Sequence, residues 1–131
     1  MGLVLVSHSR RLAEGVAELL AQLGGGEVRI EIAAGAEDGD LGTDAVAVER
    51  AIERACGEDG GSALILVDLG SAVMAADAAR ELLPARFAER VRVADAPFVE
   101  GSVAAVIEAG LGSPLEDVLA AAESAREARK L

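Results

Sequence analysis

Short, continuously apolar runs alternate along this chain with longer stretches in which apolar residues recur at helical spacing. Residues 3–6 (LVLV) and 63–67 (ALILV) are apolar at every position, which is typical of strands covered on both faces of a parallel sheet. Residues 28–32 alternate apolar with charged side chains, so we expect a less covered strand toward an edge of the sheet. A fourth short strand is expected at residues 91–93. The pattern therefore predicts four strands.

Helical periodicity follows each predicted strand. Between residues 12 and 23 leucine and valine recur on one helical face, and glycines 24–26 end this first helix. Thr43 or Asp44 can cap a second helix, which extends to Gly57.

Three further helices are expected after the third and fourth strands. Ser71 is the predicted cap of the first of these, which Pro84 closes. The other two are expected at residues 101–111 and from residue 115 to about Lys130. The third helix of the chain is expected to carry the large apolar residues Val73, Met74, Leu82 and Leu83.

This alternation of strands and helices predicts one α/β domain covering residues 1–131. Right-handed βαβ units produce an open, mostly parallel four-stranded sheet flanked by helices. Our working hypothesis for the strand order is 2-1-3-4, and the pattern leaves open a short extra edge strand.

Charge and composition narrow the function. Twelve Lys and Arg against 23 Asp and Glu leave a net charge of −11, which argues against nucleic-acid binding and favours basic partner surfaces. The chain has two aromatic residues, Phe87 and Phe98, and therefore no stacking platform for bases or sugars. Cys56 is the single cysteine and is expected to be a structural thiol. No signal sequence or membrane-length apolar run is visible, so we expect a cytoplasmic protein without membrane contact.

The candidate chemistry lies at the ends of two predicted strands. His8, the only histidine, follows the first strand, and Asp68 follows the third. Ligands of open α/β sheets collect at the carboxyl ends of strands, and the order 2-1-3-4 would bring these two residues together. A carboxylate that holds the proton on one imidazole nitrogen leaves the other free to attack phosphorus. We therefore interpret His8 as a phosphoryl-carrying nucleophile and Asp68 as the residue that orients it.

Hydroxyl and amide groups near this pair could bind a phosphoryl group. The candidates are Ser7 and Ser9 at the first helix start, and Gly70 and Ser71 at the third. Simpler roles remain open at this point, because Asp68 can cap a turn and both Ser7 and Ser9 can be ordinary turn residues.

Motifs for other chemistries are missing from the sequence. The sole lysine is Lys130, so there is no phosphate-binding loop of the G-x-x-x-x-G-K-[ST] type, and no G-x-G-x-x-G follows the first strand. One histidine and one cysteine make a poor zinc site. We therefore expect no metal and no nucleotide cofactor.

Four motifs in order resemble the phosphocarrier subunits of the phosphotransferase-dependent dihydroxyacetone kinases, which are related to mannose-type IIA domains. Mannose-type sugar domains have glycine after the active histidine, whereas this chain has Ser9, which favours the dihydroxyacetone branch. The motifs are Ser7-His8-Ser9 with Leu12, Glu14, Gly15 and Val16, then Gly35 to Asp44, then Asp68-Leu69-Gly70-Ser71-Ala72, and then Ala96 to Gly101.

The resemblance implies a mannose-type IIA-like fold and a homodimer. It also implies that His8 takes a phosphoryl group from the histidine-containing phosphocarrier protein and passes it to ADP on the nucleotide-binding subunit of dihydroxyacetone kinase. Asp68 would support His8, and the site would be rimmed by Gly39, Gly42, Thr43, Gly70 and Ser71. Two alternatives stay open: a mannose-type IIA subunit of a sugar-transporting phosphotransferase system, and a non-catalytic α/β regulatory module.

Overall fold

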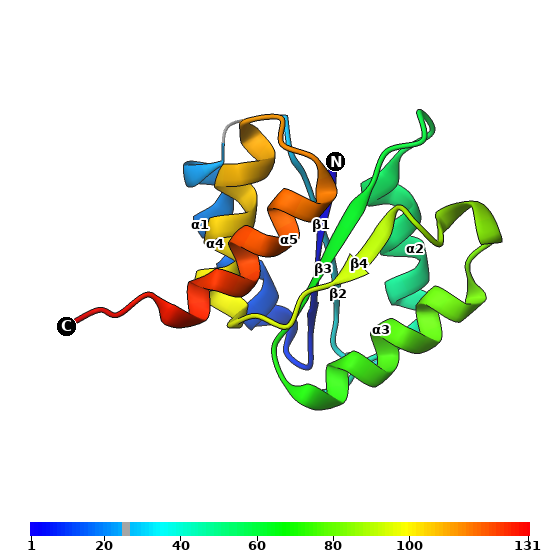
Figure 1. The fold of residues 1–131 in the computed structure, drawn as a ribbon. Helices are drawn as coiled ribbons and strands as arrows, with labels where there is room; N and C mark the ends of the chain where they lie inside the picture. Colours follow the sequence, from blue (N-terminus) through cyan, green and yellow to red (C-terminus); the bar gives the residue numbers. More distant parts are fainter. Residues whose placement is uncertain (25–26) are drawn as a thin grey trace.

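A computed structural model describes residues 1–24 and 27–131. Four parallel strands form one sheet in the order β2-β1-β3-β4 (Figure 1), which confirms the predicted fold class and strand order. The strands are β1 (Gly2–Ser7), β2 (Arg29–Ala34), β3 (Ala63–Val67) and β4 (Val91–Val93).

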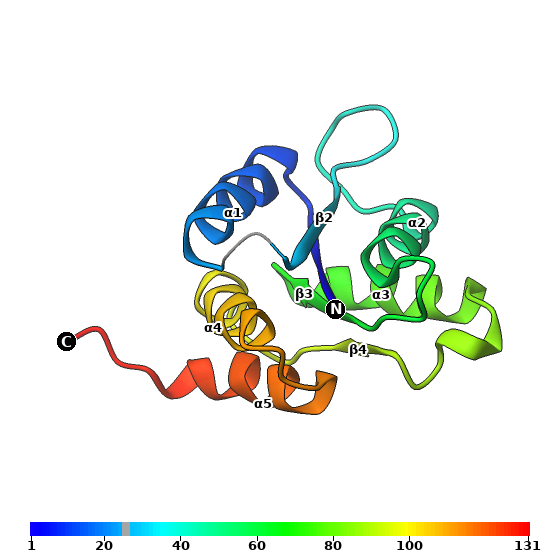
Figure 2. The same cartoon turned by 90° about the horizontal axis from the view of Figure 1, so that it is seen from above.

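Helices cover both faces of the sheet. Figures 1 and 2 show α2 and α3 on one face and α1, α4 and α5 on the other. The α-helices are α1 (Arg10–Leu23), α2 (Ala45–Cys56), α3 (Gly70–Leu82), α4 (Phe98–Gly110) and α5 (Leu115–Ser124), and two short 3₁₀ turns are η1 (Ala85–Phe87) and η2 (Ala125–Glu127). No described helix has the length and apolar character needed to cross a membrane.

Strand β1 lies at the centre of two hydrophobic cores. Val4 and Val6 pack into the core under α2 and α3, whereas Leu3 and Leu5 pack into the core under α1, α4 and α5. All four side chains are fully buried. Because successive strand residues point to opposite faces, the continuously apolar run in the sequence corresponds to a strand covered on both sides.

Helix α3 buries alanines, and its large side chains Met74 and Leu82 are exposed. Two predicted helix bounds were wrong. Helix α4 begins at Phe98 rather than at residue 101, and α5 ends at Ser124, well before Lys130. The predicted glycine stop of α1 is described only at Gly24, because residues 25 and 26 lie outside the described residues. The described part of the chain contains no fifth strand.

The parallel register fixes the position of the candidate site. Val6 of β1 is paired with Val67 of β3, and the Asp68 amide donates a hydrogen bond to the Val6 carbonyl at 3.1 Å. The residues that follow the two strands, His8 and Asp68, therefore leave the sheet side by side at its carboxyl edge.

Candidate functional site

His8 and Asp68 are in direct contact at the carboxyl edge of the sheet. The distance between His8 Nδ1 and Asp68 Oδ1 is 2.9 Å, and the side chains are 25% and 8% exposed. The residues are sixty positions apart in the sequence, and the two central strands bring them together, as the predicted strand order requires.

Asp68 is held by hydrogen bonds to both of its carboxylate oxygens. Oδ2 accepts from the backbone amide of His8 and from the hydroxyl of Ser7, each at 2.9 Å, while Oδ1 accepts from His8 Nδ1 and from the Leu69 amide at 2.7 Å. Burial raises the pKa of this carboxyl, but the hydrogen bonds from His8, Ser7 and Leu69 outweigh that effect and hold its pKa below the usual value. The group is therefore a carboxylate near neutral pH.

This carboxylate selects one tautomer of the His8 ring. An ionised carboxylate can only accept hydrogen bonds, so the proton of the neutral imidazole lies on Nδ1 and the lone pair lies on Nε2. Nε2 is 2.8 Å from the hydroxyl oxygen of Ser71, which can donate to that lone pair. The arrangement leaves Nε2 as the ring nitrogen with an available lone pair.

Ser7 and Ser9 lie in the site, but their polar groups face protein partners. The buried Ser7 hydroxyl donates to Asp68 and accepts from the Ser9 amide at 3.0 Å. The Ser9 side chain caps α1 by accepting from the Leu12 amide. The Ser7 hydroxyl therefore has its proton committed to Asp68, whereas the Ser9 hydroxyl acts as an acceptor and keeps its proton for a further partner.

The start of α3 differs from the starts of α1 and α2. Ser9 caps α1 and Asp44 caps α2 through their side chains, whereas α3 follows Leu69 and has no side-chain cap. The prediction that Ser71 caps α3 was wrong, because Ser71 lies within its first turn and its hydroxyl faces His8. Within the described residues, no acceptor is bonded to the amides of Gly70 or Ser71, so this helix start can bind an anion next to Nε2.

A glycine-containing loop between β2 and α2 borders the site on the other side. The Gly42 amide donates to the His8 carbonyl at 3.0 Å, and the Gly35 amide donates to the Ser7 carbonyl at 3.1 Å. Of the other predicted rim residues, Gly39 forms a turn with Ala36 at the exposed end of the loop, and Thr43 precedes the α2 cap. Within the described residues, no hydrogen bond joins Gly39 or Thr43 to His8.

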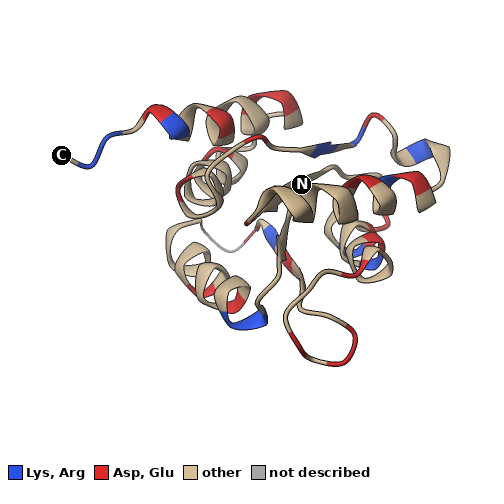
Figure 3. Ribbon diagram, turned by 90° about the horizontal axis from the view of Figure 1, so that it is seen from below, with Lys and Arg blue, Asp and Glu red and all other residues tan. Residues whose placement is uncertain are grey.

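The loop, residues 35–44, projects from the body of the molecule and is acidic (Figures 2 and 3). Glu37, Asp38 and Asp40 are exposed, and none of them forms an ion pair with a described residue. Their charge is therefore available to a partner.

Exposed apolar side chains lie on the three segments that contact His8 and Asp68, a feature that the sequence reasoning missed. Leu41 in the loop is 78% exposed, Met74 in the second turn of α3 is 75% exposed, and Leu69 beside Asp68 is 59% exposed. We call these three residues the apolar collar. The signal was present in α3, where alanines at helical spacing supply a complete buried face without Met74.

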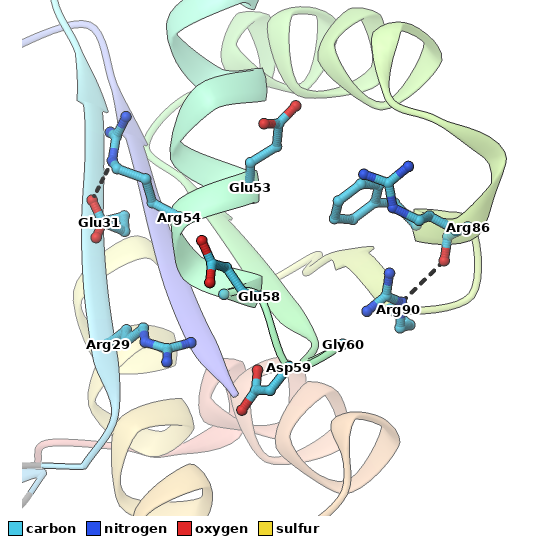
Figure 4. Close-up of a pocket in the computed structure, with 11 residues that line it drawn as sticks. Arg29, Glu31, Glu53, Arg54, Glu58, Asp59, Gly60, Arg86 and Arg90 are labelled. Carbon is cyan, nitrogen blue, oxygen red and sulfur yellow. Dashed lines mark hydrogen bonds and ion pairs between the residues drawn. The ribbon is translucent and has the colours of Figure 1, made fainter.

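A large groove lies at the opposite, amino end of the sheet (Figure 4), with a volume of about 1070 Å³. It contains neither His8 nor Asp68. Its charged lining residues are four arginines and four acidic residues: Arg29, Arg54, Arg86 and Arg90, with Glu31, Glu53, Glu58 and Asp59.

Comparisons with known proteins identify the relatives of this chain. Residues 2–119 match the family model described as PTS system fructose IIA component. The chain is 44% identical over 133 residues to the phosphoryl donor subunit DhaM of the PEP-dependent dihydroxyacetone kinase of Escherichia coli strain K12, covering 99% of this chain and 28% of that protein. It is 41% identical to the protein of that name from Pantoea ananatis, again covering 99% and 28%. The chain thus spans little more than a quarter of the length of these relatives.

Two further relatives are similar over nearly their full length. The phosphoryl donor subunit DhaM of PEP-dependent dihydroxyacetone kinase 2 from Listeria innocua is 34% identical, over 91% of this chain and 94% of that protein. A crystal structure described as unknown function protein EF1359 superimposes with a TM-score of 0.84 at 33% identity, covering 94% of this chain and 92% of that one.

Proposed function

The chain belongs to the family of PTS system fructose IIA components, and on this basis we propose that it is a phosphoryl carrier in which His8 is transiently phosphorylated on Nε2. The observation that carries the proposal is the His8–Asp68 pair beside the uncapped start of α3. The relatives named as phosphoryl donor subunits of dihydroxyacetone kinase support the same chemistry. We treat residues 1–131 as one phosphocarrier domain.

The proposed donor is the histidine-containing phosphocarrier protein, and the proposed acceptor is ADP bound on the nucleotide-binding subunit of dihydroxyacetone kinase. The lone pair of His8 Nε2 attacks the phosphorus, and the bond from phosphorus to the donor nitrogen breaks as the new bond forms. The proton stays on Nδ1, so the ring gains positive charge. Asp68 accepts from Nδ1 and stabilises that charge. Transfer to ADP reverses the process on His8 and regenerates the neutral ring.

The amides of Gly70 and Ser71 supply donors for the oxygens of the phosphoryl group. The Ser71 hydroxyl, which faces Nε2 in the unphosphorylated protein, must rotate to make room for the phosphoryl group. It can then donate to a phosphoryl oxygen.

The apolar collar and the acidic loop form the proposed docking surface for the partner proteins. Phosphoryl transfer between two proteins requires that water be excluded from the reacting atoms. Leu41, Leu69 and Met74 can provide this seal because their apolar side chains are exposed on the segments that contact His8 and Asp68. Carboxylates of the loop favour a partner with a basic surface, as the net charge of −11 also suggests.

The proposal is tested by supplying phosphoenolpyruvate, the general phosphocarrier proteins and the purified chain. We expect an acid-labile phosphoryl adduct on the wild-type chain and none on His8→Ala, because the sequence contains no other histidine. Adduct retained on a folded His8→Ala variant, or its absence from the wild-type chain, would contradict the assignment. The latter result would favour a non-catalytic regulatory module.

The name of the family model favours a second candidate, a IIA subunit that feeds a sugar transporter. The acceptor distinguishes the two. Transfer from phosphorylated His8 to ADP on the dihydroxyacetone kinase subunit supports the first candidate. Transfer to a sugar-specific IIB protein, with none to that subunit, supports the second.

A further inference from the structure

We propose that Ser7 is a positioning residue whose buried hydroxyl fixes the Asp68 carboxylate and, through it, the proton on His8 Nδ1. The inference deepens the proposed function and rests on it, because it assigns Ser7 to the tautomer of the reacting ring rather than to the phosphoryl group.

The direction of each hydrogen bond at Ser7 is determined by its neighbours. A backbone amide can only donate, so the Ser7 oxygen accepts from Ser9 N–H at 3.0 Å. A carboxylate can only accept, so the Ser7 hydroxyl donates to Asp68 Oδ2 at 2.9 Å. The hydroxyl is thereby committed at both ends, and a chain of hydrogen bonds runs from the start of α1 to the carboxylate. Bonds linked in this way reinforce one another.

The Ser7 hydroxyl also limits rotation of the Asp68 carboxylate. Oδ2 has two donors, Ser7 and the His8 amide, while Oδ1 has the His8 ring and the Leu69 amide. Without the Ser7 donor, Oδ2 has one partner and the carboxylate is less firmly held in the plane that meets Nδ1. The proton of the neutral ring then spends more time on Nε2, where it blocks the lone pair that attacks phosphorus.

Ser7 is one of two fully buried polar residues among those described, and the other supplies a matched control. Ser102 in α4 is equally buried, and its hydroxyl donates to the Phe98 carbonyl. Ser102→Ala removes one buried hydroxyl from the helical layer without touching the His8 site. Any effect common to Ser7→Ala and Ser102→Ala is therefore structural.

The experiment measures the ring-nitrogen chemical shifts of ¹⁵N-labelled His8 at a pH where the ring is neutral, together with the rate of phosphorylation. We expect Ser7→Ala to change the tautomer ratio about tenfold toward Nε2–H and to slow phosphorylation about tenfold, the effect of losing one hydrogen bond to a charged group. Ser7→Thr, which keeps the hydroxyl, should retain the wild-type ratio. Ser102→Ala should leave both values at wild type.

A second loss variant covers the case in which Ser7→Ala does not fold. Ser7→Cys keeps the side-chain volume and substitutes a weaker donor, so it should shift the ratio in the same direction. The inference would be overturned if Ser7→Ala had the same tautomer ratio and phosphorylation rate as Ser102→Ala. If Ser7→Ala does not fold, the same comparison is made with Ser7→Cys. A folded Ser7→Thr that behaves like the loss variant would also overturn the inference.

The two proposals fail in distinguishable ways. A wild-type chain that accepts no phosphoryl group would refute the proposed function, while the tautomer ratio would still report whether Ser7 positions Asp68. Normal phosphorylation with an unchanged ratio in Ser7→Ala and Ser7→Cys would refute the role of Ser7 alone.

Discussion

The two ends of the sheet differ in how their charged groups are arranged. At the carboxyl edge a single carboxylate, Asp68, is surrounded by donors, and it leaves one nitrogen of His8 facing only a hydroxyl. At the amino end four arginines and four acidic residues line a large groove. The group that we propose to react lies at the carboxyl edge and not in the groove.

The arginines of the groove are largely occupied by the protein itself (Figure 4). Arg54 is ion-paired with Glu31 at 2.9 Å, and Arg90 donates to the carbonyls of Arg86 and Gly61. The guanidinium groups of Arg86 and Arg90 lie 4.8 and 5.0 Å from the centre of the Phe87 ring. Groups that are left unsatisfied are therefore a better indication of reactivity than the volume or charge of a cavity.

Removing the charge of Asp68 should have the largest effect. We expect Asp68→Asn to slow phosphorylation of His8 by about 10²- to 10³-fold, because the amide can present a donor to the ring and favour the wrong tautomer. Single-turnover transfer from the phosphorylated donor measures the effect. Glu58→Gln makes the matched change in the groove and should leave the rate within about twofold. A similar loss of phosphorylation rate in both variants would mean that the two ends of the sheet do not differ in their importance for transfer.

Acid should abolish the stabilising contribution of the same carboxylate. The folded-state pKa of Asp68 is lowered, so its contribution is fully present above the ordinary value of about 4 and is lost as the pH falls through the folded-state pKa. The stability difference between wild type and Asp68→Asn should therefore narrow in strong acid. Urea unfolding across the acid range measures it, with the exposed Asp77→Asn as control. A difference that is constant with pH would contradict this view of the network.

Ser71 should have an intermediate effect. Ser71→Ala removes the hydroxyl that faces Nε2 and one proposed phosphoryl ligand, so we expect transfer to slow about tenfold, with the fold unchanged. Ser124→Ala, which removes an exposed hydroxyl bonded within α5, should have no effect. Wild-type rates in Ser71→Ala would leave the α3 amides as the remaining phosphoryl ligands from that helix.

The apolar collar should act on binding rather than on chemistry. Leu41→Ser should raise the KM for the phosphorylated donor protein by roughly fivefold to tenfold with little change in kcat, because a contact at the edge of an interface contributes about 1 kcal/mol. Leu82→Ser is the control, since Leu82 is also exposed but lies at the far end of α3. Equal effects of the two changes would argue against the collar as a docking surface.

The groove should show the smallest effect on transfer. Arg86→Ala removes one guanidinium from the Phe87 ring and should lower the free energy of unfolding by about 0.5–1 kcal/mol, while the transfer rate stays within about twofold of wild type. Thermal unfolding and the single-turnover assay measure the two values. A transfer defect larger than that of Leu41→Ser would mean that the groove takes part in function.

The central strands and the His8–Asp68 pair could be predicted because their signals are strong. A run that is apolar at every position, such as residues 63–67, is typical of a strand covered on both faces. The only histidine of the chain, His8, follows another run of this kind at residues 3–6. The order of the strands then places Asp68 beside it. Here the topology of the fold, rather than local sequence, supplies the contact.

Two kinds of detail could not be predicted: which residues of a helix are buried, and which hydroxyl forms which hydrogen bond. In both cases several residues of the sequence could take the same position. Alanines pack against the sheet as closely as larger residues, so α3 buries Ala76 while the larger Met74 is exposed. Ser7, Ser9 and Ser71 all carry hydroxyls near one imidazole, and only the backbone path determines which of them faces Asp68, the helix amides or Nε2. Sequence reasoning paired His8 with Asp68 but did not assign the partner of each serine.

The start of α3 has a consequence for how partner proteins distinguish the phosphorylated protein from the unphosphorylated one. A phosphoryl group on Nε2 would take the place of the missing cap, and side-chain caps stabilise helices by about 0.5–2 kcal/mol. The first turn of α3 would then become more rigid on phosphorylation and exchange its amide hydrogens more slowly. Leu69 and Met74 flank that turn. Partners that dock there would therefore contact a surface whose rigidity depends on whether His8 is phosphorylated.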